Sequence, residues 1–160
     1  MKKLIVFSLV VAFIVSCGGG NSDYAGKDDN KAINTDVPPD AVAPAYDPNR
    51  GEGKFKNVEV ANSLNTAMAA GGEKVYSVKC SGCHKLTGEK LVGPGWEGVS
   101  SRHKPEWIMN FITNTDEMIT KDPKAQAQLE ICLVRMPNQN LSDDDARNLF
   151  EFMRKNDGVK

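Results

Sequence analysis

The sequence predicts a small all-α domain that follows an export signal and a long polar linker. Three observations carry this prediction. Apolar residues recur at helical spacing in several segments after residue 63, no strand-type run competes with them, and residues 18–50 lack apolar periodicity altogether. The expected boundaries are 1–16 for the signal, 17–50 for the linker and 51–160 for the domain.

The first sixteen residues have the pattern of a secretory signal. Two lysines precede an apolar stretch, residues 4–15, whose helix would rise about 18 Å, well short of the roughly 30 Å hydrocarbon core of a membrane. The stretch ends at Ser16-Cys17 before three glycines, which resembles the lipoprotein box of bacterial exported proteins. That resemblance implies that Cys17 is lipidated and becomes the mature N-terminus. The alternative is an ordinary cleaved signal with a chance cysteine.

Residues 17–50 are expected to form a disordered linker that carries the lipid anchor. Glycine, asparagine, aspartate, alanine and proline dominate this segment, so it cannot bury enough apolar surface to offset the entropy of ordering. It also carries the net negative charge of the mature chain, whereas residues 51–160 hold equal numbers of acidic and basic residues. A neutral domain lacks the basic face that nucleic-acid binding needs, so no nucleic-acid partner is expected.

The first predicted helix of the domain lies within residues 66–79 and begins near the glycine pair at 71–72. Val75 and Val78 are three residues apart, so both are expected to face inward. Several glycines interrupt residues 85–104, and a loop is therefore expected there.

Three further helices follow this loop. Pro105 opens the first of them, because proline fits the first helical turn, and its apolar face comprises Trp107, Ile108, Phe111 and Ile112. The next begins at Asp122-Pro123, and its candidate inner residues are Ala127, Leu129, Ile131, Cys132 and Leu133. The last follows a loop at residues 136–140 and begins after Ser142, which can cap it and which precedes three acidic residues. Its inward stripe comprises Ala146, Leu149, Phe150 and Met153.

The segment KCSGCHK, residues 79–85, indicates the chemistry of the chain. Two cysteines three apart with a histidine after the second could form a redox dithiol, part of a zinc site, or a covalent haem attachment site. A thioredoxin-like dithiol needs a strand–helix–strand context that is absent here. A structural zinc ion needs about four Cys or His ligands, for which the only spares are His103 and Cys132. Haem attachment needs only the three residues present, so the sequence predicts one covalently bound haem c.

The order of motifs between residues 63 and 156 resembles a mono-haem class I cytochrome c. CSGCH follows a helix, VGPGW, RHKPEWIMNFI and MPNQNLS come next, and an amphipathic helix ends the chain. The resemblance implies a fold of three to five helices around the haem. It also implies these site residues: Cys80 and Cys83 for the thioethers, His84 as proximal iron ligand, Pro94 as acceptor of a hydrogen bond from that histidine, Met136 as distal ligand, and Trp96 and Arg102 near the haem propionates.

Other residues compete with Met136 for the distal position. Among the remaining methionines of the mature chain, 68, 109, 118 and 153, Met153 belongs to the apolar stripe of the last helix, whereas Met136 sits in a loop before proline. His103 would give bis-histidine ligation, but it lies in a polar run and is expected to be exposed to solvent. Cys132 is expected to be a buried, inert thiol, with thiolate ligation or redox sensing as the alternatives.

The predicted ligand set favours an electron carrier and not an enzyme. With both axial positions filled, no site is open to a small-molecule substrate, and the soft thioether favours Fe(II). Such a carrier docks transiently on donor and acceptor redox proteins. Four basic residues surround three apolar ones and suggest an acidic partner; they are Lys79, Lys85, Lys90 and Arg135 around Leu86, Val92 and Val134. A solvated face without a docking role is the alternative.

The cellular location of the protein and its electron-transfer pathway are expected from resemblance alone. Lipid on Cys17 would hold the protein on a membrane of the cell envelope, facing the periplasm or the outside. The motif combination is similar to lipoprotein cytochromes c that accompany nitrous-oxide reductase or other terminal respiratory reductases. The alternatives are a haem-based gas sensor or peroxidase-like enzyme with an open or displaceable distal ligand, and a fixed haem subunit of a larger oxidoreductase.

Overall fold

A computed structural model describes residues 46–160 of the chain. The expected signal, the lipidated Cys17 and the expected linker up to residue 45 lie outside the described residues, so the predictions made for them stay predictions. Within residues 46–160, no helix is both long enough and apolar enough to cross a membrane.

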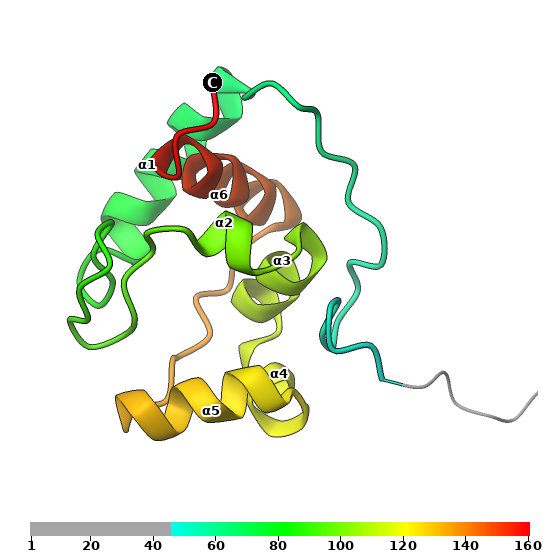
Figure 1. Cartoon of the computed structure of the whole chain (residues 1–160), viewed down its shortest axis with the longest axis vertical. Coiled ribbons are helices and arrows are strands. Elements are labelled where there is room, and N and C mark those ends of the chain that lie inside the picture. The colour runs from blue at the N-terminus through cyan, green and yellow to red at the C-terminus, as the bar shows by residue number, and fades with distance from the viewer. Residues whose placement is uncertain (1–45) are drawn as a thin grey trace, which may run out of the picture. The chain divides into compact units, whose positions relative to one another are not determined.

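The described part of the chain is all-α, as predicted, with six helices and no strand (Figure 1). Their bounds are α1 Thr66–Lys79, α2 Val99–Arg102, α3 Pro105–Thr113, α4 Thr115–Lys121, α5 Pro123–Cys132 and α6 Asp143–Asn156. The expectation of three to five helices was too low. Helices α2 and α4 have only four and seven residues, which is too short for the apolar periodicity that reveals a helix in a sequence.

The first and last helices of the domain, α1 and α6, pack directly on each other (Figure 1). A Cβ atom at Gly72 would lie 2.1 Å from the backbone oxygen of Asn148, so α1 approaches the α6 backbone more closely than any larger side chain allows. Aromatic rings pack beside this contact, where the ring centroids of Tyr76 and Phe152 are 5.4 Å apart. The packing of these two helices therefore depends on a glycine in the interior of α1.

Helix α1 differs from its prediction in its start and in one inward residue. It begins at Thr66, before the glycine pair, because the side-chain oxygen of Asn65 accepts a hydrogen bond from the Met68 backbone N–H at 3.0 Å and caps the helix. Val78 was predicted to face inward but is 84% exposed, because only one narrow side of α1 meets α6. Val75, by contrast, packs against the core.

Helix α6 begins and packs as predicted. The Ser142 hydroxyl accepts a hydrogen bond from the Asp145 N–H at 3.0 Å, and the Asp145 carboxylate accepts one from the Ser142 N–H at 3.4 Å. Its predicted stripe is buried: Ala146, Leu149, Phe150 and Met153. Helix α3 also begins at Pro105, and it buries Trp107, Ile108 and Ile112 while Phe111 is half-buried.

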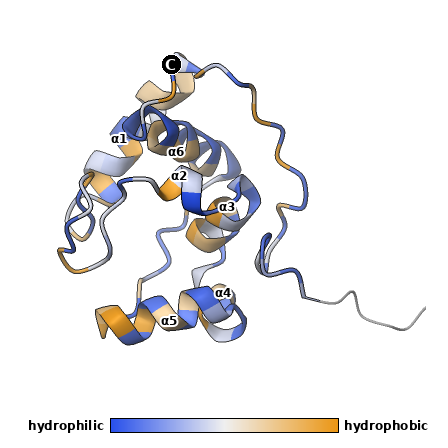
Figure 2. Cartoon of the chain, in the orientation of Figure 1, coloured by the Kyte–Doolittle hydropathy of each residue, from blue (hydrophilic) through white to orange (hydrophobic). Residues whose placement is uncertain are grey.

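The inward face predicted for α5 is confirmed only in part: Leu129 packs against the core and Cys132 is half-buried, whereas the other three residues are exposed. Ile131 and Leu133 are 68% and 84% exposed, and Ala127 is also exposed; Ala125 is the buried residue of this helix. The reason is that, among the helices described, α5 packs substantially only against α4. Much of its apolar surface therefore has no helix to pack on, and Figure 2 shows its C-terminal end as an apolar tip.

An irregular segment that we call the strap, residues 46–62, packs on the helices. The fully buried side chain of Asn110 on α3 holds it in place. The Asn110 amide nitrogen donates to the carbonyls of Arg50 at 3.0 Å and Phe55 at 2.9 Å, and its oxygen accepts from the Phe55 N–H at 2.9 Å. The Asn110 side chain thus supplies partners for three backbone groups of the strap. These groups have no helix or strand partners, because the strap is irregular.

We expect Asn110→Leu to lower the free energy of unfolding by about 2–3 kcal/mol, because it leaves the Phe55 N–H and two carbonyls without partners at a buried contact. Urea unfolding of the haem-loaded protein measures the loss, and hydrogen exchange at Phe55 will accelerate. Asn114→Leu is the matched control, since the Asn114 amide donates only to the Glu52 carbonyl, at 3.2 Å; its cost should stay near 1 kcal/mol. Equal losses in the two variants would contradict this role for Asn110.

Candidate functional site

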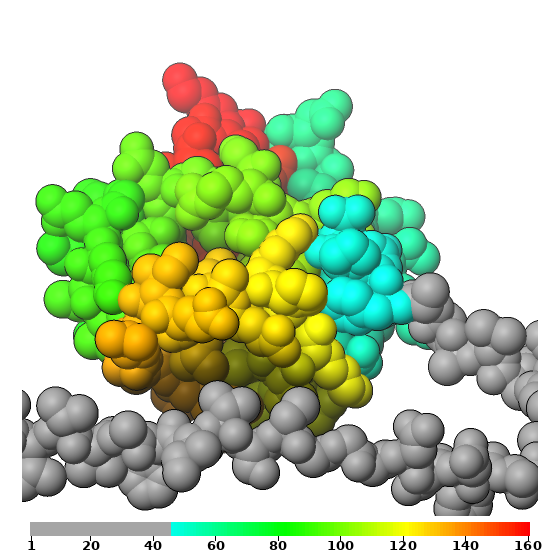
Figure 3. Space-filling model, turned by 60° about the horizontal axis from the view of Figure 1, so that its bottom comes forward, coloured from blue at the N-terminus to red at the C-terminus, as the bar shows by residue number. Residues whose placement is uncertain are grey.

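A largely apolar cavity opens between the loop after α1, helices α2 to α5, the segment after α5, and α6. Figure 3 shows α4 and α5, in yellow and orange, beside the green loop after α1. The empty volume of the cavity is about 1000 Å³, part of it open to solvent. Its lining is mainly aliphatic and aromatic and includes Val99, Ile108, Phe111, Ile112 and Leu129. A concave apolar space with few polar groups is the usual form of a cofactor site.

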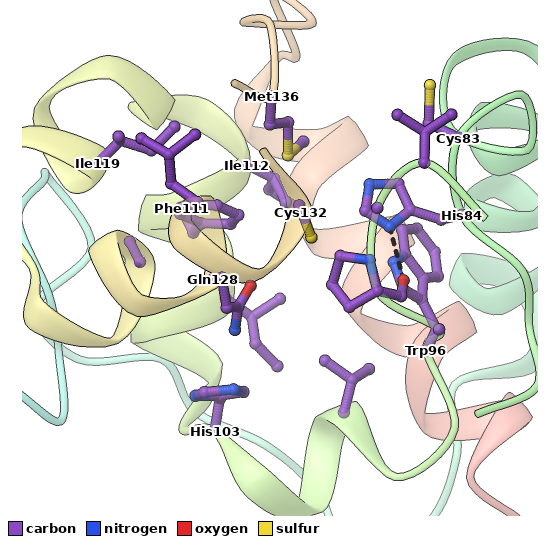
Figure 4. Close-up of a pocket in the computed structure, with 18 of the residues that line it drawn as sticks. Cys83, His84, Trp96, His103, Phe111, Ile112, Ile119, Gln128, Cys132 and Met136 are labelled. Atoms are coloured by element: carbon purple, nitrogen blue, oxygen red, sulfur yellow. Dashed lines mark hydrogen bonds between the residues drawn. The ribbon is translucent and has the colours of Figure 1, made fainter. Parts of the chain in front are cut away.

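His84 lies on one wall of this cavity, directly after the turn that ends α1 (Figure 4). Its Nδ1 is 2.9 Å from the carbonyl oxygen of Pro94, the contact that the resemblance implied. Because a carbonyl only accepts hydrogen bonds, Nδ1 carries the hydrogen and the Nε2 lone pair stays free. Burial lowers the pKa of His84, against an opposing effect of the Pro94 hydrogen bond, so the imidazole is neutral and able to bind a metal at neutral pH.

The same loop approaches the His84 ring without a side chain at Gly93, the residue before Pro94. A Cβ atom at Gly93 would lie 2.3 Å from Cε1 of His84 and 2.8 Å from its Nδ1. The Tyr76 hydroxyl donates to the His84 carbonyl at 2.7 Å and fixes the backbone of the same residue. Tyr76 therefore fixes the backbone of His84, and the absence of a side chain at Gly93 leaves room for its ring.

We expect Gly93→Ala to displace the His84 imidazole and to break its hydrogen bond with Pro94. Loss of that bond weakens the imidazole as an electron donor. The optical spectrum of the haem-loaded protein should shift toward a mixture of coordination states, and the reduction potential should change with it. Gly82→Ala is the matched control, because a Cβ atom at Gly82 would meet nothing within 4 Å. An unchanged spectrum in Gly93→Ala would show that the ring does not need this close approach.

The two cysteines of the motif are free thiols on one turn of backbone. The Cys83 and His84 N–H groups both donate to the Cys80 carbonyl, at 3.0 Å each. Burial raises the pKa of the Cys80 thiol to about 11, while Cys83 is exposed and borders the cavity. The turn thus brings the Cys83 thiol and the imidazole to one end of the cavity, while Cys80 lies in the core on the same turn.

Met136 borders the same cavity from the segment after α5, and it is half-buried (Figure 4). Two further sulfur atoms belong to the lining, those of Met153 on α6 and Cys132 at the end of α5. Cys132 is half-buried and not fully buried as predicted, and its sulfur points into the cavity in Figure 4. Met118 is fully buried against the strap and does not line the cavity.

The two residues expected near the haem propionates are placed differently from each other. Trp96 is buried beside the His84 ring, with centroids 5.5 Å apart, and it also packs on Tyr76 at 5.0 Å. Arg102 borders the cavity but is exposed, and its guanidinium donates to the Glu97 carbonyl. Trp96 also borders the cavity, so both residues lie in its wall, and their contact with the propionates stays a prediction.

The expectation that His103 is exposed was wrong. It is half-buried, because its ring stacks on Trp107 with centroids 4.0 Å apart and an interplanar angle of 14°. It borders the cavity together with Gln128 on α5, a residue that sequence reasoning did not single out (Figure 4). Only the polar run around His103 was visible in the sequence, and nothing there signalled the stacking.

The residues present fit a covalently attached haem. The cavity is apolar, as a porphyrin requires, and the His84 ring is fixed with one nitrogen free. Both cysteines of the motif are free thiols, and Cys83 borders the cavity. Elsewhere between residues 46 and 160, no three His, Cys, Asp or Glu side chains gather as a separate metal site. Fold and site together define a small all-α haem protein.

Comparison with known proteins identifies its family. The cytochrome c family model matches residues 69–157, and the chain belongs to the cytochrome c family. It is similar to the solved cytochrome c from Rhodothermus marinus, with 30% identity, a TM-score of 0.64, and coverage of 66% of this chain and 90% of that chain. An engineered form of the Rhodothermus protein matches with 28% identity, a TM-score of 0.63 and the same coverage. A further engineered form, bound to a carbene intermediate, matches with 28% identity, a TM-score of 0.60 and again the same coverage.

Family membership has two consequences. The chain binds covalently attached haem c, and its function is haem-based electron transfer, which requires redox protein partners.

Proposed function

We propose that this chain is a one-electron carrier in which His84 and Met136 occupy the two axial positions of the haem iron. The observation that carries the proposal is the orientation of His84, whose Nδ1 is engaged by Pro94 at 2.9 Å so that Nε2 is left for the iron. The Met136 thioether borders the same cavity from a segment free of helical constraint. With both positions held by side chains, no site is open to a substrate.

The chain's own residues would tune the one-electron Fe(III)/Fe(II) couple that the haem supplies. Met136 is a soft, neutral ligand and favours Fe(II). The hydrogen bond from His84 to Pro94 raises the basicity of the imidazole, and a more basic ligand favours Fe(III). Cys80 and Cys83 would hold the macrocycle by thioethers, and the apolar lining would limit the access of water to the iron.

The surface around the cavity mouth would receive the donor and acceptor proteins. Val92 and Val134 border the cavity and are exposed, and their sequence neighbours Leu91, Ile131 and Leu133 are exposed as well. Two of the basic residues expected there connect segments that are distant in sequence. Lys90 Nζ donates to the Ile131 carbonyl at 2.9 Å, and Lys79 Nζ donates to the Gln139 carbonyl at 2.8 Å. Within residues 46–160 neither lysine is paired with a carboxylate, so both retain a charge that an acidic partner can meet.

The other two basic residues contribute less to such docking. Lys85 is paired with Glu89 at 2.7 Å, and Arg135 is paired with Asp116 at 3.0 Å. Each carboxylate cancels much of the charge that a partner would meet at that point of the rim. The acidic partner proposed from the sequence would therefore depend on two lysines and on the apolar rim, which suits a small, transient interface.

The anchor and the destination of the electrons are further parts of this proposal, and they rest on the sequence. Lipid on Cys17, supported by the Ser-Cys-Gly pattern after the apolar signal, would place the carrier on a membrane of the cell envelope, facing the periplasm or the outside. The motif resemblance supports delivery of electrons to a terminal reductase, with nitrous-oxide reductase as the named candidate.

Carbon monoxide binding to the reduced, haem-loaded protein tests the ligand assignment. An iron held by His84 and Met136 will keep its spectrum when carbon monoxide is added. Ready binding would show that the distal position is open or easily displaced, and the gas-sensor or peroxidase-like alternative would then replace the carrier. Co-purification in mild detergent separates a free carrier from a fixed subunit of a larger oxidoreductase.

A further inference from the structure

Asp122, at the start of α5, has a fully buried carboxylate. Its two oxygens accept three hydrogen bonds, from the Ala125 backbone N–H at 2.8 Å, from Nε1 of Trp107 at 3.0 Å, and from the hydroxyl of Tyr46 in the strap. No lysine, arginine or histidine between residues 46 and 160 forms an ion pair with it. Fully buried carboxylates are rare unless a cation is paired with them, so this group calls for an explanation beyond packing.

The three donors favour the ionised form of this carboxylate. Backbone and indole N–H groups can only donate hydrogen bonds, and a charged acceptor makes such bonds stronger. Tyr46 also keeps its hydrogen, because burial and the hydrogen bond to Asp122 raise the pKa of its hydroxyl. Asp122 is therefore a negative charge that is surrounded by donors and has no cation beside it.

The carboxylate lies directly behind the wall of the haem cavity. Two of its three partners, Trp107 and Ala125, belong to the cavity lining, whereas Asp122 itself does not. Lys124 is exposed, and its Nζ donates to the Pro48 carbonyl at 2.9 Å, so it does not neutralise Asp122 at close range. Because the carboxylate is buried and the wall is largely apolar, its field reaches the cavity with little screening.

A negative charge at this place disfavours the arrival of an electron. One electron from the donor protein lowers the charge of the iron by one, as Fe(III) becomes Fe(II), and a nearby carboxylate opposes that change. We propose, on the basis of the electron-carrier function above, that Asp122 lowers the reduction potential of the haem and that the Tyr46 hydroxyl limits this effect. Met136, the soft ligand, favours Fe(II), so Asp122 acts against it. Asp122 keeps its charge in both states, so no proton accompanies the electron at this residue.

Potentiometry of the full-length, haem-loaded protein at neutral pH tests this role. Asp122→Asn keeps the shape of the side chain and one acceptor oxygen, and asparagine caps a helix as well as aspartate does, but the negative charge is removed. The reduced form should gain about tenfold over the oxidised form at a given applied potential, which is a rise of about 59 mV in the reduction potential.

Glu117→Gln is the matched control for the change in net charge. Glu117 is an exposed carboxylate on α4, paired with Lys121 at 2.8 Å. Water and salt screen such a charge, so the potential of this variant should stay close to that of the wild type. A shift in Asp122→Asn no larger than the shift in Glu117→Gln would overturn the proposal.

Tyr46→Phe provides a test of opposite sign. It removes the hydroxyl donor and leaves the carboxylate with its two N–H partners, so the charge acts more strongly on the haem and the potential should fall. A general loosening of the cavity wall would shift Tyr46→Phe and Asp122→Asn in the same direction, and that result would overturn the proposal. If Asp122→Asn does not bind haem, Tyr46→Phe decides alone: a fall supports the proposal, and an unchanged or raised potential overturns it.

Carbon monoxide binding separates this role from the assignment of the axial ligands. Reduced Asp122→Asn should exclude carbon monoxide as the wild type does, because its iron keeps both ligands. Admission by this variant alone would overturn the proposal, since Asp122 would then act by holding the distal ligand in place and not by its charge. Admission by the wild type would contradict the carrier assignment instead, whereas an unchanged potential in Asp122→Asn leaves that assignment intact.

Discussion

The Met136→Ala variant, reduced and loaded with haem, will bind carbon monoxide, whereas the wild-type protein will not. Alanine cannot reach the iron, so the distal position becomes open to an external ligand. The reduction potential will also fall, on the order of 0.1 V, because axial ligands control the potential of haem over a range of about 0.8 V and the thioether is the ligand that favours Fe(II). Optical titration with carbon monoxide and potentiometry measure the two effects.

Three other variants make this result specific. Met153→Leu and Cys132→Ser remove the two rival sulfur atoms that border the cavity, and Met68→Ala removes a half-buried methionine that does not. All three should still exclude carbon monoxide. If Met136→Ala excludes it while Cys132→Ser or Met153→Leu admits it, the distal ligand is that other sulfur and the assignment of Met136 fails.

Gly72→Ala will destabilise the domain by about 3 kcal/mol, the upper end of the usual cost of overpacking. The new methyl group would lie 2.1 Å from the Asn148 backbone oxygen and 2.8 Å from Cβ of Phe152. Neither atom belongs to a flexible side-chain end, so α1 and α6 must move apart. The higher helix propensity of alanine returns only about 1 kcal/mol. Urea unfolding of the haem-loaded protein, followed by helical circular dichroism, measures the loss.

The neighbouring glycine provides the control for this prediction. A Cβ atom at Gly71 would lie 3.1 Å from the side-chain amide nitrogen of Asn148, which can rotate away. Gly71→Ala should therefore be neutral or slightly stabilising, through the helix propensity of alanine. A similar loss in both variants would mean that the backbone freedom of this glycine pair, and not close helix packing, is what the domain requires.

Elements whose evidence is local could be predicted from the sequence. Ser142 and Asp145 are three residues apart and cap α6 by themselves, and Pro105 marks the start of α3 through its own ring. The attachment motif is contiguous, so haem c could be expected without any knowledge of the fold. The contact between His84 and Pro94 came only from resemblance, because nothing in the nine residues of loop between them dictates it.

Residues that act through distant partners could not be predicted in this way. Asn110 reads as an ordinary polar helix residue, and its backbone partners lie 55 to 60 positions earlier in the chain. His103 reads as exposed, because its burial comes from stacking on Trp107. The inward face predicted for α5 failed in part for a related reason. Its apolar residues were all assigned to a protein core, but some of them border the cofactor cavity and others are exposed.

The sparse packing of α5 divides the domain into parts of unequal rigidity. This helix has one substantial helix neighbour, and segments with few buried contacts open at lower free energy than a core does. Met136 follows α5, which has few packing contacts, whereas His84 follows α1, which is packed against α6. In the proposed carrier, the bond between the iron and the Met136 sulfur would therefore be the first to break on heating or in denaturant. Local opening of α5 would then limit the lifetime of six-coordinate iron well before the domain as a whole unfolds.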